Sequence, residues 1–381
     1  MKRRILVVLG MHRSGTSLIS AALEALGVSF GDSLIPGRAD NPKGYWEDER
    51  LVELNNDVLA ASGYASGDMG FPGLSGNVLN SGGAFLERAV VLLDELLAGH
   101  AIVGLKDPRM PRLMLFWQAA FDKLGLQADY IVAARHPLSV ADSLAARDHL
   151  SRPKALALWY EHSCRSLQWA LPRGGLVVDY DRLLAAPREQ LARLSSRLAL
   201  EGSEYRLTRF FDDVLDDGLR HSNYADFELN CAEGVFPALR QVHLAMQGLS
   251  RDDVDPAIWG PMEVEFEQIL PLLVFVGRLD QQLWRLASIR SNELARCAEV
   301  ERELSDVALE LEAKIQALES SKQELVRKIE LYGGELSEIR NLRENDQMSL
   351  RAVEAQLEGI YASRSWRITR PLRAIRRFLK V

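Results

Sequence analysis

The 381-residue sequence has few cysteines and no apolar run long enough for a membrane-spanning helix. The three cysteines, Cys164, Cys231 and Cys297, lie far apart, which argues against a disulfide framework and against a cysteine-based zinc site. This usage fits a reducing compartment, and we expect a cytoplasmic protein. The basic start and the apolar run after it imitate a signal peptide, but no small-residue cleavage pattern follows. We therefore expect that run to be the first strand.

Acidic residues are absent from the last 18 positions, residues 364–381, which hold seven basic side chains. Because this tail carries +7 and the whole chain −7, the other 363 residues carry −14. An acidic body argues against a nucleic-acid-binding surface. The tail places apolar residues at 368, 372, 375 and 379 on one helical face, as in helices that lie on anionic membranes. Docking on an acidic partner, or on the chain's own acidic body, is the alternative.

A third absence concerns the loop after the first apolar run, which lacks the lysine of nucleotide-binding P-loops. The run is followed by Gly10, four further residues and Gly15, and then a helical pattern begins. A strand–loop–helix of this shape points backbone N–H groups and the positive end of the helix dipole at one place, where an anion binds. Thr16 stands where the lysine is expected, and the cation comes earlier, at Arg13. A tight turn without a ligand is the alternative.

Three further short apolar runs occur at 101–105, 130–134 and 175–179, and helical patterns separate them. This alternation predicts an α/β fold with a P-loop-like parallel sheet flanked by helices. In such folds ligands bind at the carboxyl ends of the strands. Helices are also expected at 17–27, 48–61 and 84–98, with a long flexible loop at 62–83.

Polar side chains stand where these runs end. Lys106 follows the second run and could neutralise charge on a transferred group, although a salt bridge within Lys-Asp-Pro-Arg is equally consistent. Arg135 ends the third run, and Ser143 lies about two turns into a helix that Pro137 opens. Tyr180 follows the fourth run. Because parallel strands end at one edge of a sheet, we expect these side chains near the anion loop.

The loop resembles the 5′-phosphosulfate loop of sulfotransferases that use 3′-phosphoadenosine 5′-phosphosulfate (PAPS). In that family a Lys or Arg precedes Ser-Gly-Thr-Thr or Ser-Gly-Thr-Ser, and residues 13–17 match this pattern. The spacing of Arg135 and Ser143 resembles the family's 3′-phosphate motif, and residues 178–184 resemble its Tyr-Glu-Asp-Leu segment. The resemblance covers about residues 4–225. It implies that Arg13, Ser14, Gly15, Thr16 and Ser17 hold the 5′-phosphosulfate, that Arg135 and Ser143 hold the 3′-phosphate, and that Tyr180 lies near the adenine unless it is a structural tyrosine.

Three departures from the family pattern stand out. Asp107-Pro108 replaces the Thr-His of some members, so the histidine base is absent, as in the bacterial and Golgi-type branches that use a carboxylate. Leu18 stands where cytosolic members have a tryptophan that stacks on adenine. The late Arg-Lys-Gly phosphate loop is missing, and Arg220-His221 is its nearest substitute.

The base that accepts the proton of the acceptor has three candidates. Glu47 and Asp48 follow an aromatic pair that could shield them and raise a carboxylate pKa, although both could simply place negative charge at a helix start. Asp107 is the competitor. His12 lies inside the loop and is expected to shape the site or face outward. The resemblance implies that Lys106 stabilises charge on the bridging oxygen of the donor.

The character of the chain changes near residue 291, where apolar residues begin to follow a seven-residue repeat. The repeat predicts a coiled coil that forms a homo-oligomer, most simply a dimer, and Gly333-Gly334 interrupts it. A single helix folded back on the body is the alternative. The predicted division is a sulfotransferase-like α/β domain at 1–225, a helical extension at 226–290, a coiled coil at 291–361 and a basic amphipathic tail at 362–381.

The sequence thus predicts a PAPS-dependent sulfotransferase that moves a sulfuryl group to a hydroxyl acceptor. The resemblance to the family suggests a polysaccharide or glycolipid as the acceptor. The basic tail suggests peripheral contact with the inner face of a membrane. No metal is implied, because Arg and Lys supply the charge that Mg²⁺ supplies in phosphoryl transfer. The alternatives are a nucleotide-dependent kinase, which the missing lysine disfavours, and a coiled-coil scaffold with a catalytically silent P-loop domain.

Overall fold

The computed structural model describes residues 3–38, 41–74, 83–215, 224–331 and 336–362. It divides the chain into two compact units, Met1–Gln281 and Gln282–Val381. The strand-end residues singled out from the sequence all belong to the first unit. Three predicted features, namely Arg220-His221, Gly333-Gly334 and the basic tail, lie outside the described residues.

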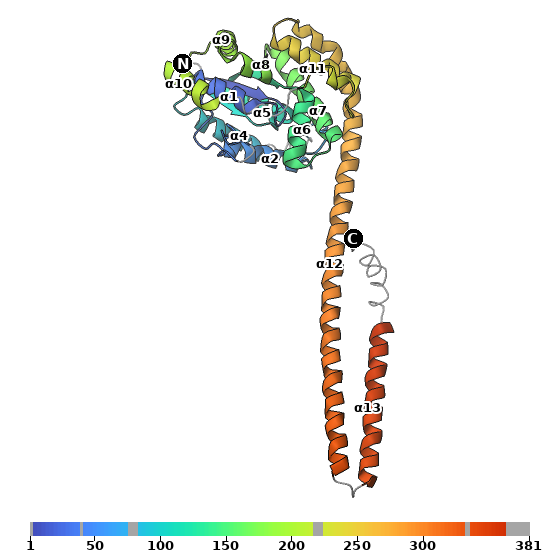
Figure 1. Ribbon diagram of the computed structural model, residues 1–381. Coiled ribbons are helices and arrows are strands. Elements are labelled where there is room, and N and C mark those ends of the chain that lie inside the picture. Colours follow the sequence, from blue (N-terminus) through green and yellow to red (C-terminus); the bar gives the residue numbers. More distant parts are fainter. Residues whose placement is uncertain (1–2, 39–40, 75–82, 216–223, 332–335, 363–381) are drawn as a thin grey trace. The chain divides into compact units, whose positions relative to one another are not determined.

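A four-stranded parallel sheet forms the centre of the first unit (Figure 1). β1 lies between β2 and β3, with Val7 beside Leu105 on one side and beside Tyr130 on the other. The four apolar runs of the sequence are the four strands, so the α/β fold with a parallel sheet flanked by helices is confirmed. In sheet order the strands are β2 (Ile102–Lys106), β1 (Arg4–Leu9), β3 (Gln127–Ala134) and β4 (Leu176–Asp179).

Helices connect the strands and continue the chain beyond the sheet (Figure 1). The helices between the strands are α1 (Thr16–Ala25), α2 (Glu49–Ala61), α4 (Gly83–Leu96), α5 (Met110–Leu124), α6 (Pro137–Asp148) and α7 (Arg152–Ala170). Those after β4 are α8 (Tyr180–Ala185), α9 (Pro187–Leu198), α10 (Glu204–Arg209), the π-helix η2 (Phe210–Val214), the 3₁₀ turn η4 (Glu228–Asn230), α11 (Pro237–Ser250), α12 (Trp259–Leu331) and α13 (Leu336–Ala362).

The central strand is buried on both faces, which explains its unbroken apolar sequence. Side chains of a strand alternate between the two faces of its sheet. Ile5, Val7 and Leu9 accordingly pack with residues of α2, α4, α5, α6, α7 and α11, whereas Leu6 and Val8 pack with residues of α1, α8 and α9. All five side chains are fully buried. The sheet is therefore a rigid platform whose carboxyl edge can hold a site.

The segment 62–83 was expected to form a flexible loop, but part of it belongs to the hydrophobic core. Met69 and Phe71 are 7% and 0% exposed. The backbone N–H groups of Gly70 and Phe71 donate to the two carboxylate oxygens of the buried Glu161 on α7, at 2.9 and 3.1 Å. Arg112 of α5 pairs with the same carboxylate at 2.8 Å. This buried cluster fixes residues 69–71 in place, so this part of the segment is not a flexible loop.

The segment predicted as a helical extension shares the core of the α/β unit. Leu239 and Val242 of α11 pack in the same cluster as β1, and so do Trp259 and Phe266 at the start of α12. The helical character predicted for 291–361 is present in α12 and α13, while self-association stays a prediction. Among the described residues, no helix combines the length and the apolar character that crossing a bilayer requires.

Candidate functional site

The loop between β1 and α1 leaves the start of α1 open. Gly15 precedes the helix with φ +86° and offers no capping side chain, and the first turn contains no acidic residue. The N–H groups of this turn and the helix dipole therefore favour an anion at this point. A Cβ atom at Gly15 would lie 2.3 Å from Cδ2 of Tyr180, so the ring of Tyr180 packs directly on the loop. Glycine is required here by both its backbone angle and its contact.

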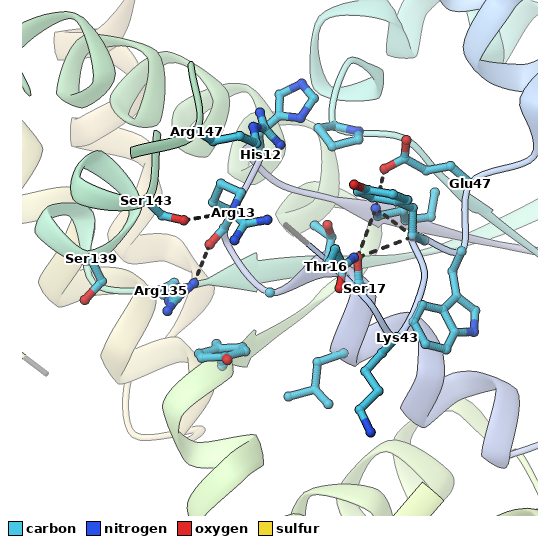
Figure 2. A pocket seen from close by; sticks show the side chains of 18 of the residues that line it. His12, Arg13, Thr16, Ser17, Lys43, Glu47, Arg135, Ser139, Ser143 and Arg147 are labelled. Atoms are coloured by element: carbon cyan, nitrogen blue, oxygen red, sulfur yellow. Dashed lines mark hydrogen bonds and ion pairs between the residues drawn. The ribbon is translucent and has the colours of Figure 1, made fainter. Parts of the chain in front are cut away.

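Arg13 links the loop to the two residues predicted to hold a 3′-phosphate. Its carbonyl oxygen accepts a hydrogen bond from Nη1 of Arg135 at 2.8 Å, and its Nε donates to Oγ of Ser143 at 2.8 Å (Figure 2). The Arg13 backbone is left-handed, with φ +68°, a conformation that residues other than glycine seldom adopt and that clusters at functional sites. The three predicted residues are thus brought together although 130 positions separate Arg13 from Ser143.

Arg135 is held by an aromatic ring and by its own backbone. Its guanidinium carbon lies 4.3 Å from the centre of the Tyr180 ring, and Trp159 donates to its carbonyl oxygen at 3.2 Å. Arg135 is only 8% exposed, and its Nε has no hydrogen-bond partner among the described residues. A buried donor of this kind is well placed to bind an oxygen of an anionic ligand.

These residues line a cavity of about 730 Å³ at the carboxyl edge of the sheet. Seven of the eight predicted donor-binding residues border it, and the exception is Ser14, whose side chain is buried at 2% exposure. The prediction from the sequence did not include other residues that line the cavity, among them Ser139 and Arg147 on α6. Their spacing was the available signal, because positions 139, 143 and 147 fall on one face of a helix. The seven predicted residues are Arg13, Gly15, Thr16, Ser17, Arg135, Ser143 and Tyr180.

Lys106 connects the anion loop to a carboxylate. It ends β2, and its ammonium donates to the hydroxyl of Ser17 at 3.4 Å, to the carbonyl of Tyr45 at 2.9 Å and to Oε1 of Glu47 in a short ion pair. The Lys106 side chain is 2% exposed. One cation therefore lies between the start of α1 and the first base candidate.

Glu47 is positioned by an unusual backbone at the residue before it. Trp46 is left-handed with φ +54°, and its indole N–H donates to Oε2 of Glu24 on α1 at 2.9 Å. The carbonyl of Glu47 accepts from the N–H of Ile35 at 2.8 Å. Burial raises the pKa of the Glu47 carboxyl above its ordinary value and outweighs the neighbouring Lys106 ammonium, which favours the ionised form.

The other two base candidates have structural partners. Asp48 caps α2, and its Oδ1 accepts from both the N–H and the Nε of Arg50 at 3.0 Å. Asp107 is fully buried, with Oδ2 accepting from Asn55 at 2.7 Å and Oδ1 from the N–H of Arg109 at 2.9 Å. Neither residue lines a cavity at the site, whereas Glu47 does. The geometry thus favours Glu47 as the group that can meet a ligand.

Glu47 also borders a second cavity, of about 630 Å³. This cavity shares with the first cavity His12, Tyr45, Glu47 and Arg147. Withdrawal from water lowers the pKa of the His12 imidazole well below its ordinary value, and the positive charges of Arg109 and Arg147 act in the same direction. His12 is therefore neutral near pH 7, and Glu47 is the carboxylate that borders both cavities.

Comparisons with known proteins find distant structural likenesses only. No family model and no curated protein matches the sequence. The sulfotransferase domain of the olefin synthase of Synechococcus PCC 7002 matches with 17% identity and a TM-score of 0.35, over 71% of this chain and 96% of that domain. The sulfotransferase domain of the curacin biosynthetic pathway matches with 15% identity and a TM-score of 0.34, over 63% and 90%. Likenesses of this strength say nothing about the reaction, so the function has to come from the residues of the site.

Proposed function

We propose that this chain is a sulfotransferase that moves a sulfuryl group from PAPS to a hydroxyl acceptor. The main support is the position of the Lys106–Glu47 pair. Lys106 reaches Ser17 at the start of α1, and Glu47 borders both cavities. A donor bound in the first cavity and an acceptor bound in the second would meet at this pair, as an in-line transfer requires.

The first cavity supplies a separate partner for each charged part of PAPS. The open start of α1 and Arg13 suit the 5′-phosphosulfate. Arg135 and Ser143 suit the 3′-phosphate, because Arg135 keeps a buried N–H without a partner among the described residues. The ring of Tyr180 positions Arg135 by stacking on its guanidinium. We propose contact with the adenine as a further role for the Tyr180 ring.

The transfer can be written with these residues in fixed roles. The acceptor oxygen attacks sulfur, the new O–S bond forms, and the bond from sulfur to the bridging phosphate oxygen breaks, which releases 3′-phosphoadenosine 5′-phosphate (PAP). Glu47 takes the proton of the acceptor hydroxyl. Lys106 stabilises the negative charge that grows on the bridging oxygen.

The acceptor is proposed to occupy the second cavity. Arg38, Arg109 and Arg147 line it together with the carboxylates of Glu47 and Asp148, so its wall is rich in hydrogen-bonding groups. Such a wall suits a hydroxyl-rich ligand, and we retain a sugar of a polysaccharide or glycolipid as the expected acceptor. Its volume of about 630 Å³ lies within the usual range for small-molecule sites.

The rival functions fit the site less well. A metal-dependent kinase needs carboxylate oxygens for Mg²⁺ beside its phosphates. Two carboxylates line the first cavity, namely Glu47, which is paired with Lys106, and Asp142, which is paired with Arg152. Because each already has a cationic partner, neither is a ready ligand for Mg²⁺. A catalytically silent module would bind the nucleotide and release no PAP from PAPS.

The test is isothermal titration of the full-length chain with PAP, with ADP plus Mg²⁺ as the comparison. Arg135→Ala should weaken PAP binding by about 1.5–3 kcal/mol, or roughly 10- to 150-fold, because a charge-assisted hydrogen bond to the 3′-phosphate is lost. ADP lacks that phosphate and should lose much less. Arg188→Ala is the control, since Arg188 stacks on Phe211 at the same 4.3 Å but lies outside the cavity. Equal losses for PAP and ADP, or no PAP binding by the unchanged chain, would contradict the proposal.

A further inference from the structure

Two histidines and an aspartate lie close together at the start of α6. His136 precedes α6, Asp226 lies in the segment before η4, and His243 lies on α11. One ligand atom from each lies within 4.8 Å of the other two, and Nε2 of His243 is 3.1 Å from Oδ1 of Asp226. The two imidazole rings meet edge to face, with centres 4.8 Å apart. Three separate segments thus bring potential metal ligands to one point.

The nitrogen atoms of His136 are not equivalent. Nδ1 accepts from the N–H of Leu138 at 3.3 Å and so caps α6. Nε2 is buried and has no hydrogen-bond partner among the described residues, in a side chain that is only 5% exposed. Buried polar atoms without a partner are uncommon in folded proteins, and each calls for an explanation. An unobserved ligand that Nε2 contacts is one such explanation.

The protonation states suit a cation. Burial lowers the pKa of His136 to about 4, and His243 adds to the effect, while burial also lowers the pKa of His243. Both rings are therefore neutral near pH 7 and can offer a lone pair. Hydrogen bonds from His243 and Gln247 help to lower the pKa of Asp226 despite its partial burial, so this carboxylate is ionised. Neutral imidazoles and an ionised carboxylate are the forms in which these groups bind metal ions.

We propose that His136, Asp226 and His243 bind one divalent transition-metal ion, with zinc as the preferred ion. Two imidazoles and one carboxylate are a common zinc ligand set that leaves a fourth position for water. Metal–ligand bonds of about 2.0–2.2 Å place tetrahedral ligand atoms roughly 3.4 Å apart. The His243–Asp226 pair already meets this spacing, and the His136 ring has to approach by at most about 1.4 Å. Binding through Nε2 moves the ring proton to Nδ1 in both histidines, so His136 gives up its long contact with Leu138 and His243 gives up its hydrogen bond to Asp226.

The ion would stabilise one wall of the first cavity. Tyr224 stacks on the His136 ring with centres 5.6 Å apart, and its hydroxyl makes a short hydrogen bond to Asp142 of α6. Asp142 and Ser143 line the cavity on the same helix. A metal ion would tie the segment around Asp226 and helix α11 to the start of α6, so its role is structural and independent of the proposed transfer.

The full-length chain, dialysed against a chelator, is titrated with Co²⁺ and then with Zn²⁺. We expect visible absorption bands that saturate at one Co²⁺ per chain and disappear when Zn²⁺ displaces the ion. Zn²⁺ should also raise the thermal unfolding temperature. Asp226→Asn preserves side-chain size but removes the charged ligand, so it should weaken Co²⁺ binding at least about tenfold. His243→Ala should abolish the bands.

His100→Ala is the matched control, because His100 is an exposed histidine outside the cluster. It should bind Co²⁺ like the unchanged chain. Bands that persist in both Asp226→Asn and His243→Ala, or an unchanged chain that binds less than one equivalent, would overturn the proposal. In that case the three residues form only a packed hydrogen-bonded cluster. The titration uses no nucleotide, so its result is separate from that of the PAP experiment.

Discussion

The contact between Gly15 and Tyr180 allows a prediction with an internal control. Gly15→Ala places a Cβ 2.3 Å from Cδ2, 2.9 Å from Cγ and 3.0 Å from Cβ of Tyr180. These atoms belong to the base of the side chain, so the ring cannot escape by rotation alone and the start of α8 must move. Gly63 has nearly the same backbone angle, φ +80° against +86°, but a Cβ there meets nothing within 4 Å. Gly63→Ala therefore measures the backbone cost alone.

The magnitudes follow from these two positions. A left-handed alanine costs about 1–2 kcal/mol in either variant. Displacing Tyr180 from a packed position should add about 1–3 kcal/mol in Gly15→Ala only. With a urea m-value of about 2 kcal/mol/M, the unfolding midpoint of Gly15→Ala should lie roughly 0.5–1.5 M below that of Gly63→Ala. PAP binding should weaken in Gly15→Ala alone, because Arg135 stacks on the ring that is displaced.

Tryptophan fluorescence is the suitable probe for this unfolding experiment. Five of the seven tryptophans lie within residues 1–281, whereas circular dichroism would also report the long helices α12 and α13, which extend beyond that unit. In a Tyr180→Ala background, Gly15→Ala should lower the midpoint little more than Gly63→Ala does, since the obstructing ring is gone. Equal midpoints for Gly15→Ala and Gly63→Ala would refute the contact, and so would an extra loss from Gly15→Ala that survives in the Tyr180→Ala background.

Three further predictions concern the reaction and the assembly. With a panel of test saccharides, the rate of PAP release from PAPS should rise with pH through the raised pKa of Glu47, because the base must be ionised. Glu47→Gln should lower turnover about 10²- to 10⁴-fold, and Asp48→Asn should lower it far less. The reverse order would assign the base to Asp48 instead of Glu47. Lys106→Ala should lower turnover with little change in PAP affinity, while Arg13→Ala should lower both, and normal turnover by Lys106→Ala would remove its proposed role. In sedimentation experiments, the full chain should form a dimer that is lost when it is truncated after Arg290, and an oligomer that survives the truncation would refute the coiled coil.

The strands and the loop could be predicted because their signals are local. A strand covered on both faces has a continuous apolar run, as β1 does, and a polar residue that ends such a run must lie at one edge of the sheet. Lys106 and Arg135 were found in this way. The contact of Arg135 with Arg13 follows from the parallel order of the strands, which places the end of β3 beside the end of β1.

The choice among the carboxylates could not be made from the sequence, because long-range contacts decide it. Nothing near Asp107 indicates that Asn55, 52 positions away, occupies one of its oxygens. The left-handed Trp46 likewise depends on Glu24 of a preceding helix. The second cavity was not foreseen for the same reason, since residues from the anion loop, the segment before α2, the loop between β2 and α5, and α6 line it together. The core position of Phe71 was missed because Glu161, 90 positions later, binds its backbone.

The ion pair between Lys106 and Glu47 connects binding of the donor to activation of the base. Without a donor, the Lys106 ammonium stabilises the ionised carboxylate, and this attraction partly offsets the effect of burial on the pKa of Glu47. A phosphosulfate at the start of α1 would compete for the same ammonium, which already lies 3.4 Å from Ser17. As Lys106 turns toward the donor, its hold on Glu47 weakens and the proton affinity of the carboxylate rises. Under the proposed function, the acidic limb of the pH profile should therefore lie at higher pH for the donor-bound chain than for the free chain, and Glu47 would be strongest as a base only when a sulfuryl group is present to be transferred.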